Sequence, residues 1–157
     1  MVNVLFVCMG NICRSPMAEG IFRREITRAG LQDKVQFDSA GTHSYHVGAP
    51  PDTRAQGAIK KRGVDISDLR GRQVADADFD RFDYILAMDG DNLRLLQHQA
   101  PADKHSKARL LLSYSQQYRN QEVPDPYYGG AQGFEENLDM IEDAVAGLIE
   151  EIRQKLG

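Results

Sequence analysis

The chain has 157 residues, of which 41% are hydrophobic and 27% are charged, and its formal net charge is −4. This length suits one domain over residues 1–157, with enough apolar residues to form a core without disulfides or a metal. The negative charge argues against binding to nucleic acid, and no apolar run approaches the roughly 20 residues of a membrane span. Because the N-terminus also lacks the basic region of a signal peptide, we expect a cytoplasmic protein that binds neither nucleic acid nor membrane.

Apolar runs and turn signals alternate along the first half of the chain. Ser15 followed by Pro16 matches the N-cap and the first position of a helix, and Gly30 is a typical helix stop. The elements predicted in this half are a strand over 2–7, a helix from Ser15 to about residue 29, a strand over 34–40, a loop over 41–51 and a helix over 52–62. The inward positions of the first helix are predicted to be Met17, Ile21, Phe22 and Ile26.

The second half of the chain continues this alternation. The elements predicted here are strands over 82–88 and 108–112, a short helix over 91–99, a long loop over 113–130 and an amphipathic helix over 131–156. Together the elements predict an α/β fold, with a doubly wound, four-stranded parallel sheet and helices on both faces. Ligands of such sheets bind beyond the carboxyl ends of the strands, where Cys8 lies.

Both cysteines of the chain, Cys8 and Cys13, lie in the segment VCMGNICRSP between the first predicted strand and helix. Gly10 allows a positive φ and close approach of a ligand, and the helix N-terminus supplies partial positive charge. The guanidinium of Arg14 offers paired donors that match two oxygens of a phosphate. The segment therefore predicts a phosphate-binding loop with a thiol at its base.

The positive surroundings of this loop favour the thiolate form of Cys8, which is a nucleophile for a bound phosphoryl group. The spacing of Cys8 and Arg14 alone is weak support, because chance supplies it too often. The alternative is that Cys8 is a small buried residue at a strand end and that Arg14 lies on a solvated turn. The strand before the loop and the helix start after it favour phosphoryl chemistry.

Phosphoryl transfer to a thiolate releases an alkoxide or phenoxide that needs a proton from an acid. Asp125 lies between Pro124 and Pro126, which restrict its backbone, and Tyr127 and Tyr128 follow it. A rigid acid beside aromatic rings is a candidate general acid for an aromatic substrate. The alternative is a tight turn before the last helix.

Several segments are similar to the low-molecular-weight protein tyrosine phosphatases, namely VCMGNICRSPMAEG, DSAGT (38–42), VGAPPDTRA (47–55), AMDGDNL (87–93) and DPYYGG. The resemblance covers nearly the whole chain. It implies hydrolysis of phosphotyrosine and aryl phosphates through a phosphocysteine intermediate, without a cofactor or a metal. The implied partner is a phosphotyrosine-containing protein or peptide, and inorganic phosphate is the product.

The resemblance also implies roles for individual residues. Cys8 is the implied nucleophile, Arg14 the clamp on the phosphoryl oxygens, and Asp125 the general acid that later acts as base. Ser15 is implied to stabilise the thiolate when it leaves. The residues implied to bind phosphate or substrate are Met9, Gly10, Asn11, Ile12, Cys13, Ser15, Tyr45 and Tyr127, with Met9, Tyr45 and Tyr127 walling the ring-binding slot.

Two further roles follow from the resemblance. Asn11 is implied to hold the shape of the loop through a bond to Ser39. Cys13 is implied to trap an oxidised Cys8 as a reversible disulfide, which would make the protein redox-sensitive. The alternative is that Cys13 only packs the loop.

Three rival functions share parts of this pattern. Arsenate reductases of the same fold need further cysteines, whereas this chain has two. Protein-arginine phosphatases carry threonine where this chain has Ile12, whose apolar side chain cannot bond a guanidinium. A phosphopeptide-binding module without turnover would not need Cys8 and Asp125 together with Arg14.

The chain departs from the resemblance at the outer wall of the pocket. Tyr45 and His46 stand where many relatives carry Trp and Asn, so the preference for peptides stays open. The histidines, which are His43, His46, His98 and His105, have no metal-ligand spacing and are interpreted as surface or loop residues, with the pocket rim as an alternative place for His46.

Overall fold

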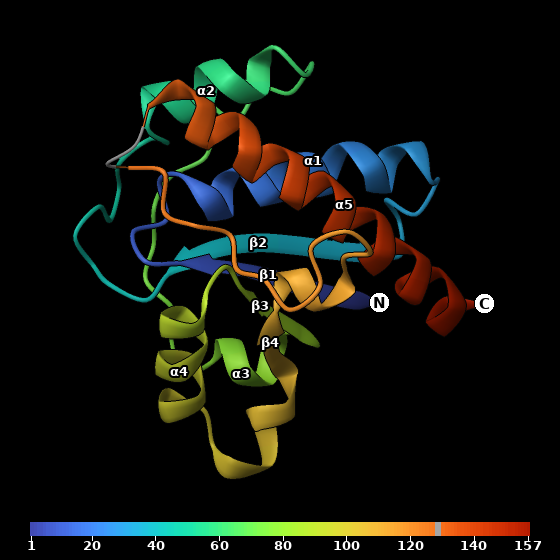
Figure 1. Cartoon of the computed structure of the whole chain (residues 1–157). Helices are drawn as coiled ribbons and strands as arrows, with labels where there is room; N and C mark the ends of the chain where they lie inside the picture. The colour runs from blue at the N-terminus through green and yellow to red at the C-terminus, as the bar shows by residue number, and fades with distance from the viewer. Residues whose placement is uncertain (128–129) are drawn as a thin grey trace.

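A four-stranded sheet runs through the middle of the protein (Figure 1). In the computed structural model, which describes residues 1–127 and 130–157, all strand pairs are parallel and the order is β2-β1-β3-β4. The strands are β1 (Val2–Cys8), β2 (Val35–Gly41), β3 (Tyr84–Ala87) and β4 (Ala108–Leu110). Tyr128 and Gly129 of the predicted acid loop lie outside the described residues.

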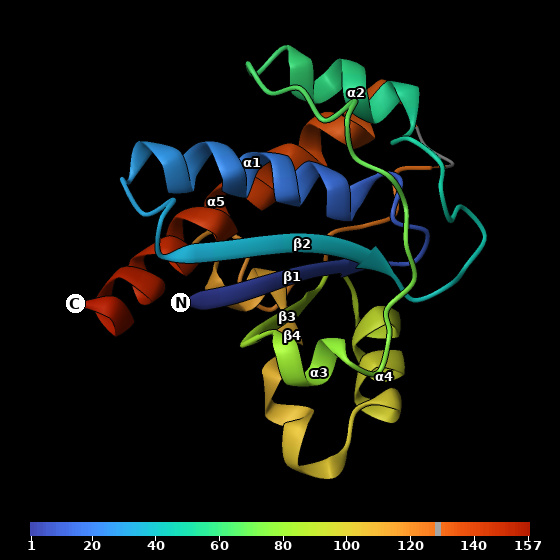
Figure 2. The ribbon, with the colours of Figure 1, turned by 180° about the vertical axis from the view of Figure 1, so that it is seen from behind.

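Helices lie on both sides of the sheet, as Figures 1 and 2 show from opposite directions. One side carries α1 (Arg14–Arg28), α2 (Thr53–Lys60) and α5 (Ala131–Leu156). The other side carries α3 (Asp78–Arg81) and α4 (Gly90–Gln99), and the short 3-10 helices η1 (Ala102–Lys107) and η2 (Leu111–Tyr114) flank β4. The predicted doubly wound, four-stranded parallel sheet is confirmed. Within the described ranges no helix combines the length and apolar character that crossing a membrane requires.

Strand β1 contributes to the core on both faces of the sheet, because successive side chains point in opposite directions. Val4 and Phe6 belong to the cluster formed with α1 and α5, whereas Leu5 and Val7 belong to the cluster on the α4 side. All four side chains are fully buried, which explains the continuous apolar run in the sequence. Cys8 continues this alternation and falls on the α1 side at the carboxyl end of the strand.

The apolar stripes predicted for α1 and α5 face the core. The predicted positions of α1, all at most 1% exposed, are Met17, Ile21, Phe22 and Ile26. Helix α5 buries its stripe from Phe134 to Ile152, and Leu156 in its last turn is partly buried. Gly30 has a φ of 72° and stops α1, as predicted, because few residues other than glycine adopt this conformation.

Some boundaries differ from the sequence prediction. Helix α1 begins at Arg14 with Cys13 at its N-cap position, so the predicted N-cap role of Ser15 and the predicted first helical position of Pro16 are wrong. The strand predicted over 108–112 ends at Leu110, because the 3-10 helix η2 begins at the next residue. Helices α3 and η1 were not predicted, since elements this short carry no periodic apolar pattern.

Candidate active site

A pocket of about 210 Å³ opens beyond the carboxyl end of β1. Its lining residues are Cys8, Met9, Gly10, Ile12, Cys13, Arg14, Tyr45, His46, Asp125 and Tyr127. They come from the loop between β1 and α1, the loop after β2 and the segment before α5. Parallel strands end at one edge of the sheet, and this edge brings the three segments together. The other predicted site residues, Asn11, Ser15 and Ser39, are buried and bonded to one another.

The loop after Cys8 has a left-handed backbone at Asn11, where φ is 58°. Gly10, which would allow a positive φ, does not adopt one. Asparagine tolerates the left-handed region better than most side chains. A Cβ at Gly10 would lie 2.9 Å from Cδ2 of His46, so a side chain there would collide with the wall of the pocket.

The side chain of Asn11 fixes the loop by bonds in three directions. Its Nδ2 donates to Ser15 Oγ at 2.8 Å and to Ser39 Oγ at 3.1 Å. Its Oδ1 accepts from the N–H of Arg72 at 3.0 Å. The bond between Asn11 and Ser39 that the resemblance implied is thus present, and the bond to Arg72 could not be read from the sequence. These bonds offset the cost of the left-handed backbone, about 1–3 kcal/mol.

The thiol of Cys8 is buried at the base of the pocket, 3% exposed. Its Sγ lies 3.0 Å from Ser15 Oγ and accepts from the N–H of Asn11 at 3.3 Å. Both groups can stabilise negative charge on the sulfur. Cys13 occupies the N-cap position of α1 and makes no side-chain cap there, so the positive end of the helix stays available to an anion.

The guanidinium of Arg14 is almost fully buried and is held on two sides. Its Nη1 lies 2.6 Å from Asp89 Oδ2 and donates to the carbonyl of Val123 at 3.0 Å. Its Nη2 is 3.8 Å from Asp125 Oδ2. Burial by itself lowers the pKa of Arg14, but the charges of Cys8 and Asp89 outweigh it and raise the pKa above the ordinary value. Arg14 is therefore a fixed cation at the pocket.

Asp125 reaches the pocket from a well-anchored segment. Its Oδ1 accepts from the N–H of Tyr127 at 3.0 Å, so Oδ2 is the oxygen nearer Arg14. Val123 is fully buried and its N–H donates to the carbonyl of Met88 at 2.9 Å. Asn137 of α5 donates to the carbonyl of Pro124 at 3.1 Å. These bonds, as well as the flanking prolines, set the position of the acid.

Aromatic side chains form the rim of the pocket. Tyr45 is 72% exposed and stacks on His43, with ring centroids 5.1 Å apart. The guanidinium of Arg54 lies 5.2 Å from the ring centroid of Tyr127. It also donates to the backbone carbonyl of Tyr127 at 3.0 Å. His46, which we interpreted as a surface or loop residue, also lines the pocket. An exposed aromatic rim of this kind suits a planar ring.

The family model described as low molecular weight phosphotyrosine protein phosphatase matches residues 3–156. The chain belongs to this family. The low molecular weight protein-tyrosine-phosphatase YfkJ of Bacillus subtilis is 41% identical over 155 residues, which are 99% of this chain and 98% of that protein.

Solved structures of this phosphatase family have the same fold. A crystal structure of a protein tyrosine phosphatase from Entamoeba histolytica, with Hepes in its active site, gives a TM-score of 0.95 at 41% identity and covers 100% of both chains. The crystal structure of a Drosophila arginine phosphatase gives a TM-score of 0.89 at 36% identity and covers 97% of this chain and 98% of that one.

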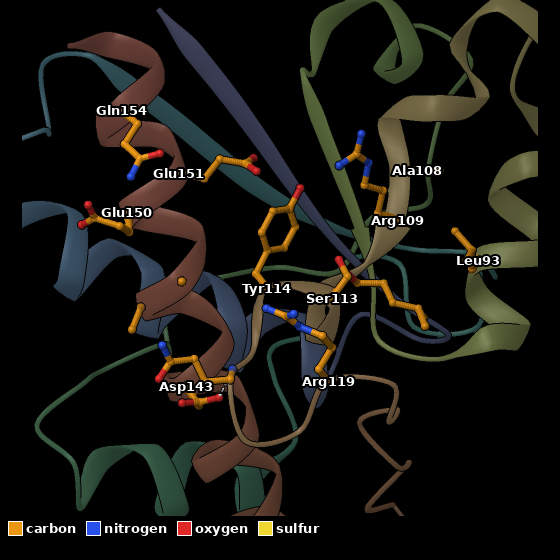
Figure 3. A pocket seen from close by; sticks show the side chains of 14 residues that line it. Leu93, Ala108, Arg109, Ser113, Tyr114, Arg119, Asp143, Glu150, Glu151 and Gln154 are labelled. Atoms are coloured by element: carbon orange, nitrogen blue, oxygen red, sulfur yellow. Dashed lines mark hydrogen bonds between the residues drawn. The ribbon is translucent and has the colours of Figure 1, made fainter.

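The protein has a second groove, which lies between β4, η2 and α5 (Figure 3). Its volume of about 880 Å³ is larger than that of the pocket at Cys8. Its lining includes Arg109 of β4, Tyr114 of η2, and Glu150 and Glu151 of α5. None of the described lining residues is a cysteine or a histidine. The groove therefore lacks a nucleophile of the kind that Cys8 provides in the smaller pocket.

Sequence reasoning missed two polar residues around the phosphatase pocket, Asp89 and Arg72, and gave a place of His46 at the rim only as an alternative. Asp89 holds Arg14 and also caps α4, through a bond to the N–H of Asn92 at 2.8 Å. Arg72 holds Asn11, and His46 packs against Gly10. For Asp89 a signal was available: it follows β3, the neighbour of β1, so the two strands end at one edge.

Proposed function

We propose that the protein is a phosphoric monoester hydrolase that acts on phosphotyrosine in proteins or peptides, with Cys8 as nucleophile. The observation that carries this proposal is one pocket lined by Cys8, Arg14 and Asp125. A buried sulfur, a fixed cation and an acid oxygen 3.8 Å from that cation are the groups that two-step phosphoryl transfer needs.

In the first step, the thiolate of Cys8 attacks phosphorus and a P–S bond forms while the bond to the tyrosine oxygen breaks. Arg14, with the amides of the loop from Met9, binds the phosphoryl oxygens and neutralises their charge. The leaving phenoxide takes its proton from the carboxyl group of Asp125. Tyrosine departs, and phosphocysteine remains.

In the second step, a water molecule attacks the phosphorus of phosphocysteine. Asp125, now a carboxylate, takes a proton from this water, and the P–S bond breaks to release inorganic phosphate. The electron pair of that bond returns to the sulfur of Cys8. Ser15, 3.0 Å from Sγ, donates a hydrogen bond that stabilises the departing thiolate.

The walls of the pocket support an aromatic substrate. Met9 and Tyr127, at 36% and 40% exposed, offer apolar surface beside the thiol, and Tyr45 adds a ring at the rim. Ile12 lines the same pocket and offers no hydroxyl to a guanidinium. The similarity to the Drosophila arginine phosphatase favours the rival function, removal of phosphate from arginine.

We also propose a protective role for Cys13. A peroxide would oxidise the thiolate of Cys8 to a sulfenic acid, and the thiol of Cys13 would then attack that sulfur, releasing water and forming a disulfide. Both cysteines are free and buried. Burial first, then the charges of Asp52 and Cys8, raise the pKa of Cys13 to about 12. Cys13 is therefore a neutral thiol at rest, and it loses its proton when it attacks the sulfenic acid.

The test is hydrolysis of an aryl phosphate and a phosphotyrosine peptide by the purified protein, with inorganic phosphate as the readout. Cys8→Ser should abolish turnover and still bind inorganic phosphate, because the cation at the pocket is unchanged. Ser113→Ala, an exposed serine outside the pocket, serves as the control and should retain full turnover. Turnover that survives Cys8→Ser would overturn the mechanism.

A further inference from the structure

A buried carboxyl group lies behind the phosphate-binding loop and has no part in the reaction described above. Glu19, on α1, is 7% exposed. Its Oε1 accepts from the hydroxyl of Ser39, on β2, at 2.6 Å. Burying a carboxyl group costs free energy unless hydrogen bonds compensate for it. A carboxyl group kept in such a place therefore indicates a role for the residue.

The bond to Glu19 determines the direction of a chain of hydrogen bonds. A serine hydroxyl has one proton, and that of Ser39 is used by Glu19, so Ser39 Oγ can only accept from Asn11 Nδ2. The second N–H of the same amide goes to Ser15 Oγ. The bond from Arg72 N–H to Asn11 Oδ1 requires the same orientation of the amide. The contacts of Glu19 and Arg72 therefore require one and the same orientation of the Asn11 amide.

This chain of hydrogen bonds ends at the nucleophile, Cys8. Because Ser15 accepts from Asn11, its own proton is free to be donated onward. Two acceptors are available: Cys8 Sγ at 3.0 Å and the carbonyl of Ala40 at 3.5 Å. The sulfur is the closer acceptor, and as a thiolate it carries the charge. The proton of Ser15 therefore points at Cys8.

We infer that Glu19 is a positioning residue of the phosphatase: by accepting the proton of Ser39, it directs Asn11 and Ser15 so that a hydrogen bond is aimed at the sulfur of Cys8. The inference rests on the proposed function. Without an acceptor at position 19, the hydroxyl of Ser39 can turn toward Asn11 and disturb the amide. The step that suffers is the breaking of the P–S bond, because there the sulfur regains its negative charge.

The experiment compares two substitutions of Glu19. Glu19→Gln keeps an acceptor oxygen for Ser39 and should retain kcat within about twofold, whereas Glu19→Leu removes it and should lower kcat roughly five- to tenfold. Inhibition by inorganic phosphate should stay within about twofold of wild type in both variants, because Arg14 is untouched. Alkylation of Cys8 by iodoacetate, followed against pH, should need a higher pH in Glu19→Leu.

A double substitution tests whether Glu19 acts through Ser39. If Glu19 acts through Ser39, Ser39→Ala should lower kcat as Glu19→Leu does, and the two together should lower it no further. Ser115→Ala is the matched control, because Ser115 is also fully buried and donates to a carboxylate, Asp143. It should lower the melting temperature but leave kcat and the alkylation profile unchanged.

The outcomes separate the inference from the proposed function. Absence of turnover in the wild type would overturn both. An active wild type together with unchanged kcat in Glu19→Leu would overturn the inference alone, as would a loss of phosphate binding that parallels the loss of kcat, since this indicates a merely collapsed loop. If Glu19→Leu does not fold, Glu19→Met carries the same test with a more adaptable side chain.

Discussion

The buried carboxyl group of Glu19 should make the stability of the protein depend on pH near neutrality. Burial raises the pKa of Glu19 from 4.5 to about 7; the hydrogen bond from Ser39 opposes this change, the charges of Asp38 and Asp68 add to it, and Arg23 opposes it. The folded state thus holds this proton more tightly than the unfolded state. The contribution to stability is complete below about pH 4.5 and is lost as the pH rises through 7.

The magnitude follows from the two pKa values. At about 1.4 kcal/mol for each pKa unit, the change from 4.5 to about 7 corresponds to roughly 3 kcal/mol. Most of it, about 2–3 kcal/mol, should be lost between pH 5 and pH 8. The glutamine of Glu19→Gln cannot ionise, so this variant loses none of this stability as the pH rises. Relative to wild type, this variant should gain about 2–3 kcal/mol of unfolding free energy over that range.

Urea unfolding at a series of pH values measures this difference, because the titration of all other groups is common to both proteins. Asp143→Asn is the control: the bond from Ser115 lowers the pKa of Asp143 below 3.8, so its contribution changes only in acid. Between pH 5 and pH 8 the control should differ from wild type by a constant amount. A constant difference for Glu19→Gln as well would refute the reasoning.

Three further predictions concern the reaction. Asp125→Ala should lower kcat about 10²–10⁴-fold for phosphotyrosine and much less for activated aryl phosphates, whose leaving groups need no proton; an equal loss for both would contradict its role as acid. Asp89→Ala should lower kcat/KM roughly ten- to a hundredfold, because it frees Arg14; unchanged kinetics would show that Asp89 only caps α4. After treatment with peroxide, Cys13→Ala should regain less activity in dithiothreitol than wild type. Equal recovery would rule out protection of Cys8.

Local patterns were sufficient to predict the sheet and the long helices. The apolar run of β1 and the stripes of α1 and α5 are repeated signals that local sequence carries. The start of α1 was predicted wrongly because Ser15 has the chemistry of an N-cap, while its hydroxyl is used by Cys8 and Asn11. Here a tertiary contact overrides a local preference, as expected at a functional site.

The candidate site was predictable where its residues adjoin in sequence and not where the fold brings them together. Cys8 and Arg14 share one loop, and Asp125 is marked by its prolines. Asp89 is 75 residues from Arg14, and Arg72 is 61 residues from Asn11. The strand order places Asp89 beside the loop, whereas Arg72 lies outside the strands and only the three-dimensional structure reveals its contact. Gly10 was named as a residue that allows a positive φ, because intrinsic preference favours glycine. The residue that adopts it is Asn11, whose side-chain bonds cannot be seen in sequence.

The most direct test of the proposed function is a single comparison of substrates. The kcat/KM of the purified protein would be measured on matched peptides that carry phosphotyrosine, phosphoserine or phosphoarginine at the same position. We expect phosphotyrosine to be hydrolysed best by at least about a hundredfold, because the pocket between Ile12 and Tyr127 is walled by apolar and aromatic side chains. Faster hydrolysis of phosphoarginine, or binding of all three peptides without turnover, would contradict the proposal.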